Sequence, residues 1–193
     1  GEETAMLESM QGRPAMPRQK PPFYPTDFGL YGKPTLVNNV ETLCNIPRIL
    51  HKGAGWFTQI GTEKCPGTMM FSLSGSVNRP GVYEMPMGVT IREMVEECGG
   101  GVPGGRKIKA VFPGGPAFPM VTADQLDLTM DFDSLKKAGT GLGSAGMIVV
   151  DDAMCMVAKT LHFSNFFKNE SCGQCPPCRM GTNNLAILMT KIE

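Results

Sequence analysis

The stretch FSLSGSVNRPGVYEMPMGVTIREMVEECGG, residues 71–100, predicts two strands and a helix in succession. At its start Phe71 and Leu73 alternate with serines, which is the period-two pattern of a half-buried strand. The tripeptide Arg79–Gly81 is typical of a tight turn, and residues 82–85 then predict a second strand. The sequence therefore predicts a β-hairpin with one buried face.

A capping box marks the start of the helix that follows the hairpin. The Thr90 oxygen can accept an early backbone amide while Glu93 reaches back to the cap. Apolar residues then recur at helical spacing as far as Cys98, and the glycines at 99–101 end the helix. With a third strand at Ile108–Phe112, this order predicts a β-grasp, the ubiquitin-like arrangement. The expected core residues are Phe71, Leu73, Ile91, Met94 and Val95.

The region after the β-grasp is expected to be rich in loops. Residues 117–152 end in a short apolar strand at Met147–Val150, and residues 153–193 predict two helices around a cysteine loop. The glycines of residues 139–146 have a spacing similar to a dinucleotide-binding motif. They precede a strand instead of following one, so we interpret them as a turn.

The N-terminal region combines short helices with an irregular segment. A helical pattern over residues 4–10 ends by Gly12. Residues 13–34 contain six prolines, which disfavour helix and predict an ordered extended segment or a linker. Asn39 is expected to cap a helix that Pro47 then interrupts.

Composition excludes two broad classes of function. Among 193 residues, 18 basic side chains balance 18 acidic ones, so a general binder of nucleic acid or anionic membrane, which needs a basic surplus, is excluded. No apolar run approaches the roughly 20 residues of a membrane span. The chain begins with Gly1 and stops inside a helical pattern at Glu193, so we expect a piece of a longer protein.

Three of the seven cysteines lie close together, at Cys172, Cys175 and Cys178. This C-x2-C-x2-C run can direct three thiolates at one centre, which favours an iron–sulfur cluster completed by a fourth cysteine from elsewhere. Zinc also binds C-x2-C pairs, but the only nearby imidazole, His162, is more typical of a core or surface residue. Zinc, and a disulfide plus one free thiol, remain open alternatives.

The other cysteines are isolated in the sequence. Because no signal peptide is evident, a reducing compartment is expected and disulfides are not. Isolated cysteines among apolar neighbours usually act as small buried hydrophobes. We expect this of Cys44, Cys65, Cys98 and Cys155.

A set of motifs occurs in one order along the whole chain. They are Gly1–Ala5, Pro21–Phe23, Gly29–Thr35, Asn38–Leu43, Gly53–Phe57, Arg79–Glu84 and Glu170–Arg179. This set resembles the NADH-binding flavoprotein subunit of respiratory complex I. The relatives of that subunit include flavoprotein subunits of NAD-linked or electron-bifurcating hydrogenases and of some formate dehydrogenases. We take the complex I subunit as the main interpretation and these relatives as the alternative, which the residues of this chain do not separate from it.

The resemblance implies an α+β multidomain fragment. Residues 1–60 would be the end of an α/β domain that binds FMN and NADH, and residues 61–152 a soluble-ligand-binding β-grasp (SLBB) domain with flanking loops. Residues 153–193 would begin an α-helical [4Fe–4S] domain. The implied function is that of part of an NADH dehydrogenase subunit, which passes electrons from NADH through FMN to a [4Fe–4S] cluster. The fragment alone is expected to be inactive.

The resemblance also implies roles for individual residues. The cofactor-binding residues would be Gly1, Glu2, Glu3, Asn38, Asn39 and Thr42, and the cluster ligands Cys172, Cys175 and Cys178. The first three would lie against flavin and nicotinamide, and the two asparagines and Thr42 would hydrogen-bond FMN. The fourth cluster ligand would lie beyond Glu193, and the glycine-rich FMN and NADH loops upstream of Gly1. Met180 replaces an acidic residue of the family motif.

Implied partners are a [2Fe–2S] thioredoxin-like subunit and a multi-cluster iron–sulfur subunit, with no nucleic acid and no membrane span in this chain. Through them the protein would sit on the cytoplasmic face of the inner membrane. A non-enzymatic alternative is a β-grasp adaptor domain with a structural zinc site at the cysteine loop.

Overall fold

The computed structural model describes residues 2–193, and it divides into two units. The first unit contains the residues up to 45 together with 160–193, and the second contains residues 46–159. The expectation for Gly1 lies outside the described residues. No helix within residues 2–193 is both long enough and apolar enough to cross a bilayer.

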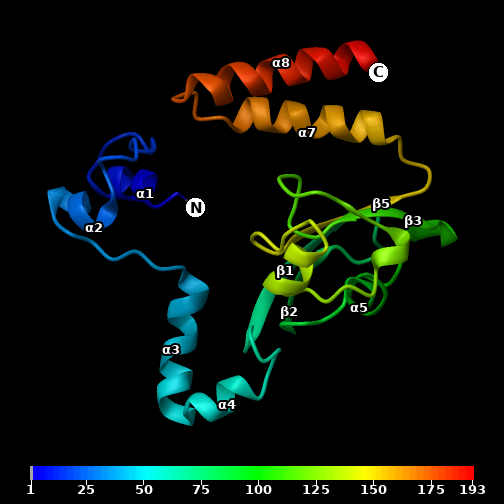
Figure 1. The fold of residues 1–193 in the computed structure, drawn as a ribbon, viewed down its shortest axis with the longest axis horizontal. Coiled ribbons are helices and arrows are strands. Elements are labelled where there is room, and N and C mark those ends of the chain that lie inside the picture. The colour runs from blue at the N-terminus through cyan, green and yellow to red at the C-terminus, as the bar shows by residue number, and fades with distance from the viewer. Residues whose placement is uncertain (1) are drawn as a thin grey trace. The chain divides into compact units, whose positions relative to one another are not determined.

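The second unit is built on a five-stranded mixed sheet with the order β2-β1-β5-β3-β4 (Figure 1). Strand β1 runs parallel to β5 and antiparallel to β2, while β3 runs antiparallel to both β5 and β4. The strands are β1 Thr68–Gly75, β2 Gly81–Pro86, β3 Ile108–Phe112, β4 Val121–Thr122 and β5 Gly146–Asp151. The helical segments are α4 Ala54–Thr58, α5 Ile91–Glu93, a π-helical turn Met94–Cys98, 3-10 turns Pro103–Gly105 and Ala123–Gln125, and α6 Phe132–Lys137.

The β-grasp and its core are confirmed. The Thr90 hydroxyl accepts a hydrogen bond from the Glu93 backbone N–H at 3.1 Å, and the Glu93 carboxylate accepts one from the Thr90 N–H at 2.7 Å. All five expected core side chains are buried in one apolar cluster. Each such burial contributes roughly 1.5–3 kcal/mol, so this cluster is the main source of stability in the second unit.

Glycine permits two close approaches in the second unit. Gly75 ends β1 with φ +87°, and a Cβ atom there would lie 2.2 Å from the Val149 carbonyl oxygen of β5. Gly141 lies against the Phe118 ring, where a Cβ would come within 2.4 Å of a ring carbon. The glycine-rich segment before β5 is therefore a packed turn, as the sequence predicted.

The loop-rich expectation for residues 117–152 was wrong over α6. The Asp131 carboxylate caps this helix by accepting a hydrogen bond from the Ser134 N–H at 2.8 Å, and Leu135 is fully buried. A helix of six residues is too short to display a periodic apolar pattern, which is why the sequence did not indicate it.

The first unit consists of short helices and loops. Helix α1 spans Glu3–Met10, α2 Pro25–Phe28, and a 3-10 turn Leu30–Gly32. Two further helices, α3 Val40–Lys52 and α7 Met156–Glu170, run across the boundary between the units, and α8 spans Pro176–Ile192. The two helices expected in residues 153–193 are thus confirmed (Figure 1). The segment that joins them, residues 171–178, contains the three clustered cysteines and includes the first turn of α8; we call it the cysteine loop.

The expected end of helix α3 was wrong, and the expected burial of the isolated cysteines was wrong in part. Helix α3 continues through Pro47 to Lys52, although proline removes one backbone hydrogen bond from the helix. Among the isolated cysteines, Cys65 and Cys98 are half-buried and pack against the apolar cluster, much as expected. Cys44 and Cys155 are exposed, so the expectation was wrong for these two. Cys44 lies on α3, which has no buried residue, and Cys155 lies in the turn before α7, so neither faces a core.

Candidate functional site

Glu2 and Glu3 share one counter-ion at the start of α1. The Glu2 carboxylate caps the helix by accepting a hydrogen bond from the Ala5 N–H at 3.0 Å. The Lys20 ammonium donates to Glu2 at 2.7 Å and also to Glu3. Lys20 comes from the proline-rich segment, so this ion pair fixes that segment to the helix start.

The two carboxylates are held in their charged form. Burial raises the pKa of Glu2, but hydrogen bonds from Lys20, Thr4 and the Ala5 N–H outweigh it and lower the pKa to about 2. The hydrogen bond from Lys20 also lowers the pKa of Glu3. With Lys20 between them, the pair carries one net negative charge at neutral pH. Such a group can orient a ligand, but it is not an acid that donates a proton.

Asn38, Asn39 and Thr42 lie at the start of α3, and all three are exposed. The Asn39 amide oxygen accepts a hydrogen bond from the Glu41 N–H at 2.7 Å, so the expected helix cap is confirmed. This bond orients the Asn39 amide nitrogen as the donor that can face a ligand.

A cavity of about 1190 Å³ brings most of the expected cofactor residues together. We call it the carboxylate cavity; among its lining residues are Glu2, Glu3, Asn38, Asn39 and Cys172. Thr42 is not among its lining residues. A space of this size suits a ligand larger than a simple anion. The carboxylate pair, two amides and one of the three clustered cysteines therefore face one space within the first unit.

The cysteine loop is shaped by Ser171 and Gly173. The Ser171 hydroxyl oxygen accepts a hydrogen bond from the Gly173 N–H at 3.2 Å, and Gly173 adopts φ +76°. The same hydroxyl lies 3.4 Å from the Cys178 sulfur. Cys175 is the N-cap of α8, so the positive end of the helix dipole faces this loop.

The donor set of this loop fits an iron–sulfur cluster. Cys172, Cys175 and Cys178 are free and exposed thiols within seven residues. In the side-chain conformations of this structure, no three Cys, His, Asp or Glu residues in the described part of the chain converge on one point, and this includes the three cysteines. Exposed cysteines can turn toward a common centre by rotation about χ1. His162 lies on α7 and is exposed.

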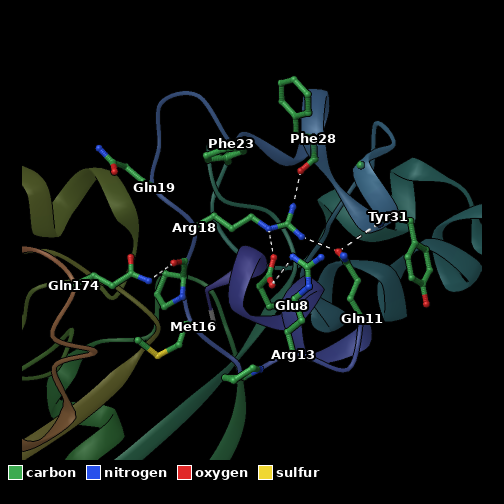
Figure 2. Close-up of a pocket in the computed structure, with 13 residues that line it drawn as sticks. Glu8, Gln11, Arg13, Met16, Arg18, Gln19, Phe23, Phe28, Tyr31 and Gln174 are labelled. Atoms are coloured by element: carbon green, nitrogen blue, oxygen red, sulfur yellow. Dashed lines mark hydrogen bonds and ion pairs between the residues drawn. The ribbon is translucent and has the colours of Figure 1, made fainter.

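A second cavity, of about 860 Å³, surrounds Arg18 and is called the Arg18 cavity (Figure 2). The Arg18 guanidinium donates to the Glu8 carboxylate, to the Gln11 side-chain oxygen at 2.7 Å and to the Phe28 carbonyl at 2.7 Å. It also reaches the Gly29 carbonyl at 3.1 Å. Arg18 thereby joins α1 to α2, with only 14% of its side chain exposed.

Sequence reasoning missed Arg18 and Lys20. Both belong to a segment without periodicity, and their side-chain partners lie 7 to 18 positions away. The available signal was weak: basic residues inside a proline-rich segment that follows a pair of adjacent carboxylates.

Two family models match parts of the chain. Residues 70–121 match the SLBB domain, and residues 158–193 match the NADH-ubiquinone oxidoreductase-F iron-sulfur binding region. The first match coincides with β1 through β4, and the second contains the cysteine loop and α8.

Similarity to whole proteins extends over the full chain. The chain is 51% identical to the F 2 subunit of the NADH-quinone oxidoreductase of Rhizobium meliloti, and 47% and 44% identical to the F subunits of the Rickettsia felis and Mycobacterium bovis enzymes. This chain is a relative of these F subunits. It is covered completely in each case, but it spans about half the length of these curated relatives, 46%, 46% and 43%.

Solved structures give the same result for the fold. The air-oxidized NAD+-reducing [NiFe]-hydrogenase matches 99% of the chain with a TM-score of 0.84 and 38% identity, over 32% of the hydrogenase chain. The H2-reduced state of that enzyme matches with a TM-score of 0.85. The resemblance to these flavoprotein families and the α+β fold class are confirmed. The domain boundaries and the roles of individual site residues remain predictions.

Proposed function

We propose that this chain forms part of the flavoprotein subunit of an NADH-quinone oxidoreductase, which oxidises NADH through FMN and passes the electrons to a [4Fe–4S] cluster. The activity belongs to the whole subunit, since the chain spans 46% of its relative from R. meliloti. The observation that carries the proposal is the carboxylate cavity. It is lined by charged and amide groups suited to a nucleotide cofactor and by Cys172 of the iron–sulfur binding region.

The carboxylate pair acts by position and charge. Glu2 and Glu3 stay ionised because Lys20 and the start of α1 hold them, so they can accept hydrogen bonds from ribose hydroxyls or the nicotinamide amide. Asn38 and Asn39 can donate amide hydrogens to the phosphate or ribityl oxygens of FMN. Bound FMN would supply the conversion of a two-electron hydride into single electrons.

The cysteine loop would hold three corners of the cluster through Cys172, Cys175 and Cys178. The N-terminus of α8, which begins at Cys175, would stabilise the negative charge of a thiolate-bound cluster. The Ser171 hydroxyl lies near enough to the Cys178 sulfur to hydrogen-bond it, and such bonds raise the reduction potential of a cluster.

The finer assignments of partners and location belong to this proposal as well. We expect the complete subunit to pass its electrons to a [2Fe–2S] thioredoxin-like subunit and a multi-cluster iron–sulfur subunit. Through these subunits it would associate with the cytoplasmic face of the inner membrane. Copurification of the tagged complete subunit tests the assignment, which fails if neither type of subunit is recovered.

A second candidate is the flavoprotein subunit of an NAD-linked hydrogenase. The match to the NAD+-reducing [NiFe]-hydrogenase at 38% identity favours it as the alternative. Hydrogen-dependent reduction of NAD+ by the purified native complex would support this candidate, whereas NADH-dependent reduction of a quinone would support the first. The zinc adaptor is disfavoured because residues 158–193 match an iron–sulfur binding region.

The cysteine loop gives the direct test. In the complete subunit Cys175→Ala removes one proposed ligand, and we expect loss of the paramagnetic signal of the cluster with FMN content largely retained. Cys155→Ala is the matched control, because Cys155 is also an exposed free thiol but lies outside the loop. An unchanged signal in Cys175→Ala, or stoichiometric zinc in place of iron and sulfide, would refute the proposal.

A further inference from the structure

The cysteine loop is attached by a side chain to the proline-rich segment. The Gln174 amide nitrogen, between Cys172 and Cys175 in sequence, donates a hydrogen bond to the Pro17 carbonyl oxygen at 2.5 Å. Figure 2 shows Gln174 reaching into the Arg18 cavity toward this carbonyl. The two residues lie 157 positions apart, and both belong to the first unit.

Pro17 lies where the two cavities meet. It lines both the carboxylate cavity and the Arg18 cavity, while Cys172 lines only the first and Gln174 only the second. The residue after it, Arg18, donates its backbone N–H to the Thr4 hydroxyl at 2.9 Å. The Pro17 carbonyl is therefore held by α1, and the Gln174 amide joins the cysteine loop to that fixed point.

We propose that Gln174 is a positioning residue, which holds the cysteine loop against the Pro17 carbonyl and so fixes the thiols relative to the Glu2–Glu3–Lys20 group. This proposal rests on the proposed function, in which the cysteine loop binds a [4Fe–4S] cluster. Ligands of a functional centre need supporting groups that hold them within about 0.5 Å of their working geometry. On this exposed loop Gln174 supplies such support from outside the ligand set.

Substitutions at this position separate the hydrogen bond from the bulk of the side chain. Gln174→Ala removes the donor. Gln174→Glu keeps the shape but turns a carboxylate oxygen toward the carbonyl oxygen, so two acceptors face each other. Gln174→Lys differs in shape yet restores an N–H donor of sufficient reach.

The experiment uses the complete native complex. We expect iron to be lost to a chelator about two- to tenfold faster in Gln174→Ala and Gln174→Glu, the range that loss of one hydrogen bond produces. Gln174→Lys should stay within about twofold of the unaltered complex for the same reason. FMN content should be equal in all variants.

Hydrogen exchange provides a readout that does not depend on the cluster. Because the contact joins two segments, amides in residues 171–178 and in residues 16–20 should both exchange faster in Gln174→Ala. The control is Gln19→Ala, which removes another exposed glutamine from the lining of the Arg18 cavity. It should leave both segments and the rate of iron loss unchanged.

The outcomes separate this proposal from the proposed function. Wild-type rates in Gln174→Ala and Gln174→Glu, or equal effects in Gln19→Ala, would overturn the role of Gln174 while leaving the cluster in place. Failure of Gln174→Lys to restore slow iron loss would assign the effect to packing and would also overturn it. Absence of iron and sulfide from the unaltered complex would instead refute the proposed function.

Discussion

In the second unit Phe71, Ile91 and Val111 are fully buried in one apolar cluster, whereas among the described residues of the first unit Leu7 and Ala186 are the buried apolar side chains. The first unit leaves other apolar residues largely exposed: Leu36, Val40, Leu43, Leu185 and Ile192. Burial of apolar surface therefore contributes much more to the stability of the second unit than to that of the first.

Polar contacts hold most of the first unit in place. Arg18 and Lys20 connect the proline-rich segment to α1 through charged hydrogen bonds, and Asn39 orders the start of α3. Charged hydrogen bonds are directional, so they fix groups in place where little apolar surface is buried. The second unit is therefore stabilised mainly by apolar packing. The candidate site in the first unit is held by polar side chains, whose contacts depend on pH and can be removed by single substitutions.

The largest expected effect is on the packed unit. Val95→Asp places an unpaired charge at a position with 0% exposure, and we expect a loss of roughly 3–5 kcal/mol in the free energy of unfolding. The melting temperature of the complete subunit is the measurement. Val82→Asp is the control, because Val82 on β2 is 59% exposed, and it should change stability little. An unchanged melting temperature in Val95→Asp would show that the core assignment is wrong.

The next effect concerns Arg18. Arg18→Ala removes several hydrogen bonds and leaves the Glu8 carboxylate, 13% exposed, without that partner, so we expect a loss of about 2 kcal/mol by denaturant titration. The matched control is Arg13→Ala, because Arg13 also contacts Glu8, but at 3.5 Å and with 65% exposure. Equal effects of the two substitutions would contradict the central role of Arg18.

A smaller effect distinguishes the two asparagines. Asn39→Ala removes a helix cap and should lower stability by about 1 kcal/mol, whereas Asn38→Ala should not. Both should lower FMN occupancy of the complete subunit while the iron content stays normal, since both amides line the carboxylate cavity. Flavin fluorescence after extraction and iron analysis measure this. Normal flavin content and activity in both variants would remove these residues from the cofactor site.

The smallest effect is a dependence on pH. With its pKa lowered from 4.5 to about 2, Glu2 contributes stability that is fully present above pH 4.5 and is lost as the pH falls toward 2. In Glu2→Gln the melting temperature should therefore fall less steeply than in the wild type as the pH is lowered from 4.5 to about 2. Asp27→Asn, an exposed carboxylate in the same unit, is the control and should keep the wild-type decline. A decline as steep in Glu2→Gln as in wild type would contradict the ion pair.

Much of the second unit could be predicted because its signals are local. Alternation at Phe71 and Leu73 and the capping box at Thr90 each lie within a few residues, and both appear in the structure as expected. Helix α6 was missed because six residues give no period, and Pro47 was given too much weight as a helix breaker.

The candidate site could be predicted only in part. Cysteine spacing and ordered motifs indicated the residues of the cysteine loop and the carboxylate cavity, since each motif is continuous in sequence. The contacts of Lys20, Arg18 and Gln174 join residues 7 to 157 positions apart. No periodicity or local propensity encodes such pairs, because they form only once the chain has folded.

The acceptor for Gln174 is a main-chain carbonyl, and this has a consequence for molecular evolution. Every amino acid carries that oxygen, so replacing Pro17 does not delete it, and only mutation at position 174 can remove the contact directly. Compensating substitutions in pairs are therefore not expected across related genes. The contact would leave no covariation signal, and selection on it would appear as a restriction to hydrogen-bond donors at a single position.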